Sequence, residues 1–516
     1  MKKSGYSPRY KFFIGLAALL VLFNLLIAND YVTIWEGAEA TMVLQAQQET
    51  LGADAMTSSD RAFLPSKVVE VVYSLLGFDI AYLRYISVLV LLLTFLGIYH
   101  WGRKIFGDEA SLLTLLVAGT SFMLVNVAKM VTADSWLFAA QSLFIIFLIL
   151  YIKQPIIKWM IGVVVMLLLG LLIEPISMLI WSMGLAVYFY FQHPNKTAAK
   201  GILLKAILPV TLLGLVFLLT QGVHSNEIFL LGYGQIGYGK YLLFTFLAIL
   251  PWLGFLIAGF LDIFMKVKKG EELAIISVGW LIFGLMSMSM VLQFLFAYLI
   301  AKHVLAYLRK PYPYEGLVKS VSLFMLLLSF IGITLMLIGG WQQLGEGGYL
   351  SLLAVGAVYW VFGFAGAMGL FLKEKRFIIG GFALSALLVT FAFWGRLYPL
   401  VEKFRDLPQQ LVNESLESSG TKMLPLNMAM KVLPERANFN VYVNANFPEK
   451  KRITSQQELD ATLQSGTPQI LIYNKQSGLQ IDSMLLKSAK VVIGNVEVSQ
   501  QPEKYWIMLV GNKGND

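Results

Sequence analysis

The 516-residue chain is 57% hydrophobic and 14% charged, and its mean hydropathy is +0.69. Globular proteins carry roughly 25% charged residues, so this composition excludes a soluble cytosolic enzyme and a secreted protein. A membrane-spanning helix needs about 20 predominantly apolar residues, and many segments before residue 395 have that length. This excludes a single-span anchor and predicts an all-α polytopic membrane domain followed by a soluble tail.

The net charge of +9 comes from basic residues scattered through short loops between apolar runs. This distribution is typical of membrane orientation signals and argues against nucleic-acid binding. Because the chain has no cysteine, disulfides and thiolate catalysis are excluded, and any metal ion would be bound by carboxylates or the four histidines.

The apolar runs predict about thirteen membrane spans. The first follows a basic amino terminus without a small-residue cleavage site, so we expect an uncleaved span. The predicted spans are 12–28, 83–100, 110–127, 135–152, 159–173, 176–191, 201–220, 241–262, 273–290, 291–308, 319–339, 349–372 and 377–395.

The loops alternate in their Lys and Arg content, and this alternation predicts the orientation. Basic residues precede the first span and return in every second loop. By the positive-inside rule, the amino terminus is cytoplasmic and the tail lies outside. The basic, cysteine-free composition and the short loops are typical of a bacterial chain, so we expect a multi-pass protein of the cell inner membrane with a periplasmic carboxyl-terminal domain.

Acidic residues gather at the predicted outer ends of different spans, as a site at the outer membrane surface would require. The first outer loop (29–82) is predicted to carry interfacial helices at 36–48 and 68–76. Outer-side candidates for a site are Glu36 and Glu39 in this loop, Asp134 at the start of the fourth span, Glu174 between the fifth and sixth spans, and His224.

The composition becomes soluble after residue 395, which divides the chain into domains 1–395 and 396–516. In the tail, 438–446, 468–474, 490–498 and 504–510 are predicted to be strands, while 456–464 and 481–488 are predicted to be helices. We therefore expect a small periplasmic α/β domain.

Several motifs occur in a characteristic order: 35–40 (WEGAEA), 63–67 (FLPSK), 82–87 (YLRYIS) and 126–138 (NVAKMVTADSWLF). This order resembles the GT-C glycosyltransferases of the protein O-mannosyltransferase and aminoarabinose transferase family. Members have an acidic motif in the first outer loop, a proline-marked interfacial helix, an arginine opening the second span and an Asp opening the fourth. Pro251-Trp252 is similar to a later motif of the same family.

The resemblance implies sugar transfer from a polyprenyl-phosphate donor to a hydroxyl group of a lipid, glycan or protein at the outer face, with inversion. It implies that Glu36 is the base that accepts the acceptor proton and that Asp134 is the second carboxylate. Lys67 and Arg84 occupy the positions of the family's phosphate-binding cations, and Lys129 is a further candidate from its position alone.

The acidic motif differs from the family pattern, because Glu36 stands between Trp35 and Gly37 where Asp-Glu is common. Glu39 lies one helical turn later on the same face and could take the second place. Glu174 and His224 are candidates for the acceptor side. A divalent cation is compatible with these carboxylates, although they do not specify one.

Alternative interpretations remain open at this level. Asp134 could be a helix N-cap, Glu174 before Pro175 could only end a helix, Arg84 could pair with Asp79, and His224 could be an ordinary loop residue. Two other functions also remain: a transporter or flippase of lipid-linked substrates, and a catalytically degenerate relative that only binds. The near absence of mid-span charge and of internal repeats disfavours a transporter.

Overall fold

The computed structural model describes residues 18–27, 29, 38–51, 63–192, 200–220, 238–309, 311–398, 412–413, 415–416, 424–429, 437–447, 449–464, 467–474, 477–481, 490–497 and 504–510. These residues form two compact units. The first is drawn from Met1–Asn29, Arg61–Pro65 and Arg84–Leu397, and the second from Asp30–Asp60, Ser66–Leu83 and Tyr398–Asp516.

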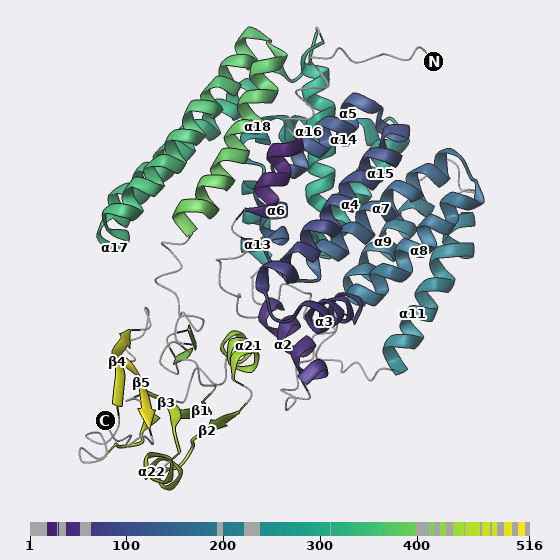
Figure 1. Ribbon diagram of the computed structural model, residues 1–516. Coiled ribbons are helices and arrows are strands. Elements are labelled where there is room, and N and C mark those ends of the chain that lie inside the picture. Colours follow the sequence, from purple (N-terminus) through teal and green to yellow (C-terminus); the bar gives the residue numbers. More distant parts are fainter. Residues whose placement is uncertain are drawn as a thin grey trace. The chain divides into compact units, whose positions relative to one another are not determined.

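The described part of the first unit is helical (Figure 1). After a first helix at residues 18–26, its elements are α4 (Ile80–Phe106, in this unit from Arg84), α5 (Asp108–Gly119), α6 (Phe122–Ala128), α7 (Asp134–Lys153), α8 (Ile157–Ile173), α9 (Pro175–Gln192), η1 (Leu203–Ile207), α11 (Leu208–Thr220), α13 (Tyr238–Leu247), η2 (Leu250–Trp252), α14 (Leu253–Val267), α15 (Glu272–Met286), α16 (Val291–Tyr307), α17 (Glu315–Leu372), α18 (Lys375–Ala392) and η3 (Phe393–Leu397).

Among the described residues, six helical segments are long and apolar enough to cross a membrane, or seven if the bent pair α5–α6 is one span. Shorter apolar helices accompany them at Ile157–Ile173, Glu272–Met286 and Val291–Tyr307. A polytopic helical membrane domain is therefore confirmed, whereas the number thirteen stays a prediction.

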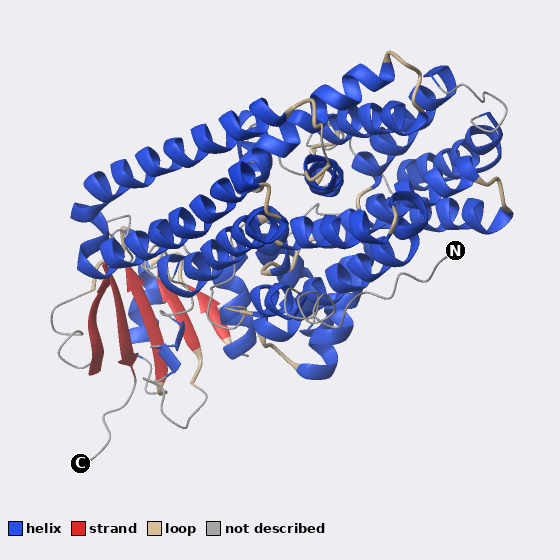
Figure 2. Ribbon diagram, turned by 90° about the horizontal axis from the view of Figure 1, so that it is seen from above, coloured by secondary structure: helices blue, strands red, loops and turns tan. Residues whose placement is uncertain are grey.

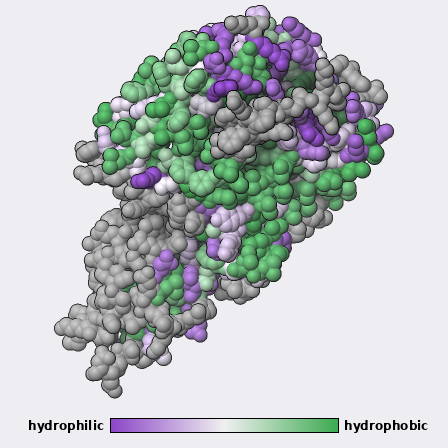
Figure 3. All heavy atoms as spheres, turned by 45° about the horizontal axis from the view of Figure 1, so that its top comes forward, coloured by the Kyte–Doolittle hydropathy of each residue, from purple (hydrophilic) through white to green (hydrophobic). Residues whose placement is uncertain are grey.

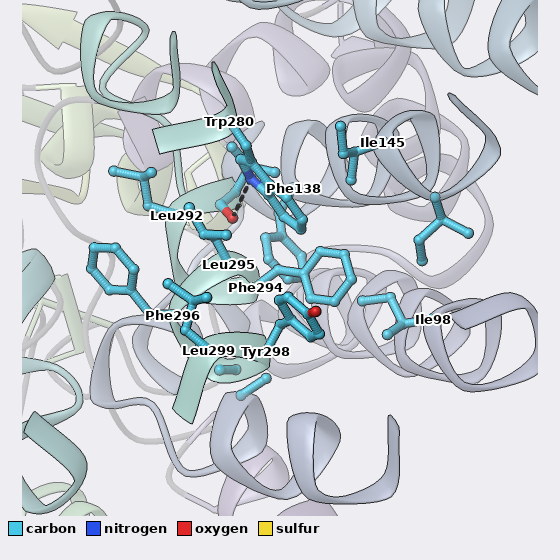
Figure 4. Close-up of a cluster of buried hydrophobic side chains, with 14 of the residues drawn as sticks. Ile98, Phe138, Ile145, Trp280, Leu292, Phe294, Leu295, Phe296, Tyr298 and Leu299 are labelled. Carbon is cyan, nitrogen blue, oxygen red and sulfur yellow. Dashed lines mark hydrogen bonds between the residues drawn. The ribbon is translucent and has the colours of Figure 1, made fainter. Parts of the chain in front are cut away.

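The centre of the first unit is α16, which is apolar on all sides and almost entirely buried. Figure 4 shows its side chains, among them Leu292, Phe294 and Tyr298, directed toward different neighbours. The indole of Trp280 on α15 donates a hydrogen bond to the carbonyl of Val291 at 3.3 Å. This bond satisfies a buried donor where α16 begins.

Two of the predicted spans, 110–127 and 241–262, are broken inside the bundle, and a third interruption lies where the predicted spans 273–290 and 291–308 meet. The break between α5 and α6 bends the chain by 68°, a 3-10 turn separates α13 from α14, and residues 287–290 separate α15 from α16. Non-helical backbone at membrane depth requires partners within the protein. The Phe122 amide accordingly donates to the carbonyl of Ala248 at 3.0 Å.

Buried polar side chains complete the links between these breaks. Ser121 Oγ donates to Gln293 Oε1 at 2.8 Å, and Gln293 Nε2 donates to the Thr245 carbonyl at 3.0 Å. Ser289 Oγ contacts Gln141 Oε1 on α7. The breaks are therefore held by a network that crosses four separate segments of the chain.

Element α17 is helical over 58 residues but does not form one straight rod (Figure 1). In a straight helix Phe330 and Trp360 would lie about 45 Å apart at 1.5 Å per residue, yet their ring centroids are 4.5 Å apart. Lys373, just after α17, contacts the carboxylate of Glu315 at its start. The two halves are thus antiparallel, as the predicted spans 319–339 and 349–372 require.

The surface of this helical unit is strongly apolar. Figure 3 shows extensive hydrophobic areas on the face in view, and large side chains on several helices are more than half exposed, including Leu96, Leu213 and Ile338. Exposure of this kind is typical of surfaces that face lipid rather than water.

The second unit combines helices of the first outer loop with the tail. Here α2 (Ala38–Leu51) packs against α21 (Ala437–Asn446). Gln47 Nε2 donates to the carbonyl of Val441 at 2.9 Å, and Phe78, just after α3 (Phe63–Leu76), makes an edge contact with Tyr442 at 5.8 Å. The predicted loop helices are present, and they pack with the tail helix.

The tail contains a five-stranded sheet in the order β2-β1-β3-β5-β4 (Figure 2). Its strands are β1 (Leu426–Ala429), β2 (Lys450–Arg452), β3 (Gln469–Asn474), β4 (Lys490–Glu497) and β5 (Lys504–Val510). β1 is parallel to β2 and β3, whereas β5 is antiparallel to β3 and β4. A helix, α22 (Gln456–Gln464), lies between β2 and β3 in the chain, as predicted.

The predicted strand at 438–446 is wrong, because this segment is helix α21. Its alternating apolar residues suggested a period of two. In the structure Phe439, Tyr442 and Val443 are buried together, which is the i, i+3, i+4 spacing of a helix face. Packing against α2 therefore overrides the local preference of its β-branched residues. The helix predicted at 481–488 lies almost wholly outside the described residues.

Two adjacent glycines on α18 provide a test of the packing between α17 and α18. A Cβ on Gly381 would meet backbone atoms of Gly366 and, at 2.9 Å, the carbonyl oxygen of Phe362, whereas a Cβ on Gly380 would meet nothing within 4 Å. We expect Gly381→Ala to lower the unfolding free energy by about 1–3 kcal/mol through overpacking. Gly380→Ala should be neutral or stabilising by up to about 1 kcal/mol.

Thermal unfolding of the two purified variants in the same detergent would measure this difference. Equal melting temperatures for Gly381→Ala and Gly380→Ala would contradict the close approach of the two helices.

Candidate functional site

Arg84 lies in the first turns of α4 and is completely buried. Its Nη1 donates a hydrogen bond to the backbone carbonyl of Asn29 at 3.2 Å. Asn29 Nδ2 in turn donates to the carbonyl of Leu25, at 3.3 Å, near the end of the first helix. A buried guanidinium in a membrane protein requires polar partners, so Arg84 is a strong candidate for a functional group.

The suggested partner Asp79 uses its carboxylate locally. Its Oδ1 accepts a hydrogen bond from the backbone amide of Ala81 at 2.8 Å. This contact satisfies one of the free amides in the first turn of α4, as an N-terminal cap does.

Lys129 is also completely buried, in the connection between α6 and α7. Its Nζ donates to the carbonyls of Asn24 at 3.0 Å and Leu25 at 3.4 Å, and also to that of Ile27. The ammonium group lies 5.7 Å from the ring centroid of Trp394. Burial and the nearby Arg84 guanidinium lower the pKa of Lys129 to about 7.

Asp134 is the first residue of α7, and Ala133 is the residue that caps this helix. The carboxylate Oδ2 accepts a hydrogen bond from Thr132 Oγ1 at 3.0 Å. Asp134 is therefore inside the helix rather than its N-cap, at a position where the helix dipole favours a negative charge.

The connection between α6 and α7 brings these groups to neighbouring helix ends. Ser87, one turn after Arg84, donates from Oγ to the carbonyl of Met130 at 2.8 Å. This bond ties α4 to the short segment that contains Lys129 and leads into Asp134. The first unit thus gathers a buried Arg, a buried Lys and a carboxylate at the ends of α4, α6 and α7.

Two other candidates belong to the second unit. Glu39 lies on α2 with a buried side chain. Lys67 lies on α3, where its Nζ pairs with Glu70 Oε2 at 2.8 Å and its side chain is 42% exposed.

The remaining candidates are Glu36, His224 and Glu174. Glu36 and His224 lie outside the described residues. Glu174 separates α8 from α9, and its Oε1 accepts a hydrogen bond from Ser177 Oγ at 3.0 Å. Its position at the helix boundary agrees with the helix-ending interpretation.

Sequence reasoning missed an apolar cavity of about 270 Å³ in the first unit. Its walls come from the α5–α6 break, the turn at Pro251 and the helices α17 and α18. Polar groups on the wall are satisfied within their own helices: Ser329 Oγ donates to the Leu326 carbonyl, and Thr390 Oγ1 to that of Ala386, both at 2.8 Å. The cavity therefore suits an apolar chain.

A path of aromatic side chains connects the cavity wall with the buried lysine. Phe122 on the wall contacts Phe393 at 5.1 Å between ring centroids, and Phe393 contacts Trp394 at 5.5 Å. The Trp394 indole donates to Asn126 Oδ1 at 2.9 Å and presents its ring to Lys129. No motif in the sequence indicated these contacts, because their partners are distant in the chain.

Within the described residues, no group of three or more His, Asp or Glu side chains is arranged to hold a metal ion. The described residues thus identify no metal ligands.

Comparison with known proteins gives two findings. Residues 60–224 match the family described as dolichyl-phosphate-mannose-protein mannosyltransferase. The crystal structure of ArnT from Cupriavidus metallidurans bound to undecaprenyl phosphate is similar with a TM-score of 0.62 and 13% identity, covering 96% of this chain and 98% of that chain. The apo structure of the same protein gives 0.62 and 15%, covering 96% and 97%. No curated protein sequence matched.

The helical unit, the tail sheet and the similarity to ArnT show that the chain is a membrane protein of the GT-C fold class. Within this class its fold is that of ArnT, and residues 60–224 carry the sequence pattern of the mannosyltransferase family. The fold class and the resemblance predicted from the motifs are thus confirmed.

Proposed function

We propose that this chain transfers a sugar, with inversion, from a polyprenyl-phosphate donor to a hydroxyl-bearing lipid, glycan or protein. The observation that carries this proposal is the buried Arg84 beside the connection that leads into Asp134. The matching family is described by a dolichyl-phosphate donor, and the ArnT structure is described as bound to undecaprenyl phosphate. Both compounds are polyprenyl phosphates, which supports a donor of this class.

The proposed roles follow from the charges needed during transfer. A carboxylate accepts the proton of the attacking hydroxyl, and we assign this role to Glu36. Asp134 is the second carboxylate, which orients the acceptor. Arg84 and Lys67 stabilise the lipid phosphate as it leaves with its added negative charge. Glu39 is the candidate for the second acid beside Glu36, and Glu174 and His224 are candidates for the acceptor side.

The apolar cavity gives the lipid part of the donor a place in the same unit. Its wall at Phe122 leads through Phe393 and Trp394 to Lys129, on which the charge of the nearby buried Arg84 acts. A lipid phosphate needs this combination, because its chain must leave water while its headgroup requires cations. We propose that the cavity accepts the isoprenoid units nearest the phosphate.

The proposed location is a bacterial inner membrane, with the amino terminus in the cytoplasm and the α/β tail in the periplasm. The support is the alternation of basic loops along the chain. The reaction is then expected at the outer face, where Asp134 opens its helix.

The first test compares two aspartates at the same helix position. Asp134 is the first residue of α7, and the exposed Asp108 is the first residue of α5. We expect Asp134→Asn to reduce transfer by roughly 10²–10⁴-fold because a reacting or orienting carboxylate is lost. Asp108→Asn should retain normal activity, since it changes only the charge at a helix start.

The assay would incubate purified protein with polyprenyl-phosphate sugars and membrane extracts, and detect products by mass spectrometry. Glu36→Gln should also be inactive while remaining folded. Full activity of both Asp134→Asn and Glu36→Gln would refute the assigned roles.

The second test fills the apolar cavity. Gly332 lines it, and a Cβ at this position would meet nothing within 4 Å. We expect Gly332→Leu to raise the KM for a long-chain polyprenyl donor by about tenfold. The leucine side chain would occupy space that the donor chain fills, and the loss of that apolar contact costs roughly 1.5 kcal/mol. Gly339→Leu is the control, because this exposed glycine lies on the same helix and outside the cavity.

Steady-state kinetics with undecaprenyl and short-chain donors would measure the effect. If Gly332→Leu and Gly339→Leu had the same KM for the long-chain donor, the cavity would not bind the chain.

A further inference from the structure

The ammonium group of Lys129 is fully used inside the protein. An ammonium group has three donors, and the carbonyls of Asn24, Leu25 and Ile27 accept from Nζ. A phosphate could bind Nζ only by displacing one of these carbonyls. The hydrogen bonds of Lys129 therefore give it a different role from Arg84 and Lys67, the cations proposed to hold the donor phosphate.

The three carbonyls belong to the end of the first helix. Residues 18–26 are helical, and the last internal bond runs from the Ile27 amide to the Phe23 carbonyl at 3.0 Å. The final carbonyls of a helix have no internal partner and form the negative end of its dipole. Lys129 supplies both donors and positive charge at this end, from more than 100 residues away in the sequence.

Neighbouring groups hold the lysine in this position. The Trp394 ring lies against the ammonium group, which is a favourable cation–π arrangement. The Trp394 indole is fixed by Asn126, three residues before Lys129. Arg84 binds the carbonyl of Asn29, two residues after Ile27.

We propose that Lys129 is a positioning residue that caps the first helix and thereby fixes where the chain leaves it toward Glu36. Asp134 follows Lys129 by five residues in a connection that Ser87 ties to α4. One lysine therefore links the starting point of the acidic outer loop to the second carboxylate. This inference rests on the proposed transfer reaction and adds a residue to its machinery that touches neither donor nor acceptor.

The protonation state of Lys129 provides a specific readout. Its pKa is lowered to about 7, first by burial and then by Arg84, the charged group that acts on it among the described residues. Below this pH the ammonium group donates to all three carbonyls. Above it the neutral amine has two donors and a lone pair, so the cap weakens. An arginine keeps its charge throughout this range.

The experiment compares Lys129→Met, Lys129→Arg and, as a control, Lys268→Met in the full chain reconstituted in lipid nanodiscs. Lys268 is an exposed lysine in a loop after α14. Three quantities are measured: kcat and KM for a polyprenyl-phosphate sugar, the Kd of undecaprenyl phosphate, and amide hydrogen exchange of peptides covering residues 18–27.

For Lys129→Met we expect kcat to fall by roughly 100-fold, because a displacement of catalytic groups by about 1 Å reduces the rate by this factor. KM for the donor and the Kd of undecaprenyl phosphate should change by no more than about twofold, as expected when an interaction outside the donor site is removed. Exchange at residues 24–27 should accelerate. Lys268→Met should match the wild type in all three measurements.

The arginine variant tests the cap without removing its charge. Activity of the wild type should decline as the pH rises through about 7, and Lys129→Arg should retain activity on the alkaline side. If Lys129→Met fails to fold, this pH comparison decides the proposal: identical alkaline profiles for wild type and Lys129→Arg overturn it.

Other results also overturn the cap. A large increase in the Kd of undecaprenyl phosphate for Lys129→Met, with kcat retained, would make Lys129 a phosphate ligand. Unchanged hydrogen exchange at residues 24–27 would show that the lysine does not hold this helix end. Exchange does not depend on turnover, so a wild type inactive with every donor would refute the proposed function while the exchange measurement still decides the cap.

Discussion

The structure depends on satisfying backbone polar groups wherever a helix is interrupted or ends away from water. Lipid offers no hydrogen bonds, so each break needs partners from another segment. The Phe122 amide finds the Ala248 carbonyl, and Ser121 reaches Gln293. The same requirement applies at the end of the first helix, where Lys129 and Arg84 serve carbonyls that have no helical partner. The breaks, the cavity wall and the candidate site are consequences of one constraint.

Much of the fold could be predicted from the sequence because hydrophobic length alone determines where spans fall. The start of α7 at Asp134 and the break before Pro175 agree with the prediction within a residue or two. The failure at 438–446 has a physical reason: a short segment with alternating apolar residues obtains its helix from packing against α2, which lies about 390 residues earlier. Local propensity carries no information on such a partner.

The candidate site likewise contains residues that could be identified from the sequence and contacts that could not. Asp134 was selected from its position at the outer end of a span, and Arg84 from the resemblance of its motif to a known family. The partners of Lys129 were not accessible to this reasoning. They are main-chain carbonyls from the first helix together with the ring of Trp394 near the end of the membrane domain. Charge suggested phosphate binding, whereas the geometry gives the lysine internal partners.

Reliance on carbonyl oxygens has a consequence for evolution of this protein. Every residue type offers the same carbonyl, so the contacts of the lysine do not depend on which side chains stand at positions 24, 25 and 27. Covariation between these positions and residue 129 would therefore be weak even though they touch. Relatives that keep this arrangement would be recognised by a lysine shortly before the aspartate that opens the fourth span, accompanied by an aromatic residue where the last transmembrane helix ends.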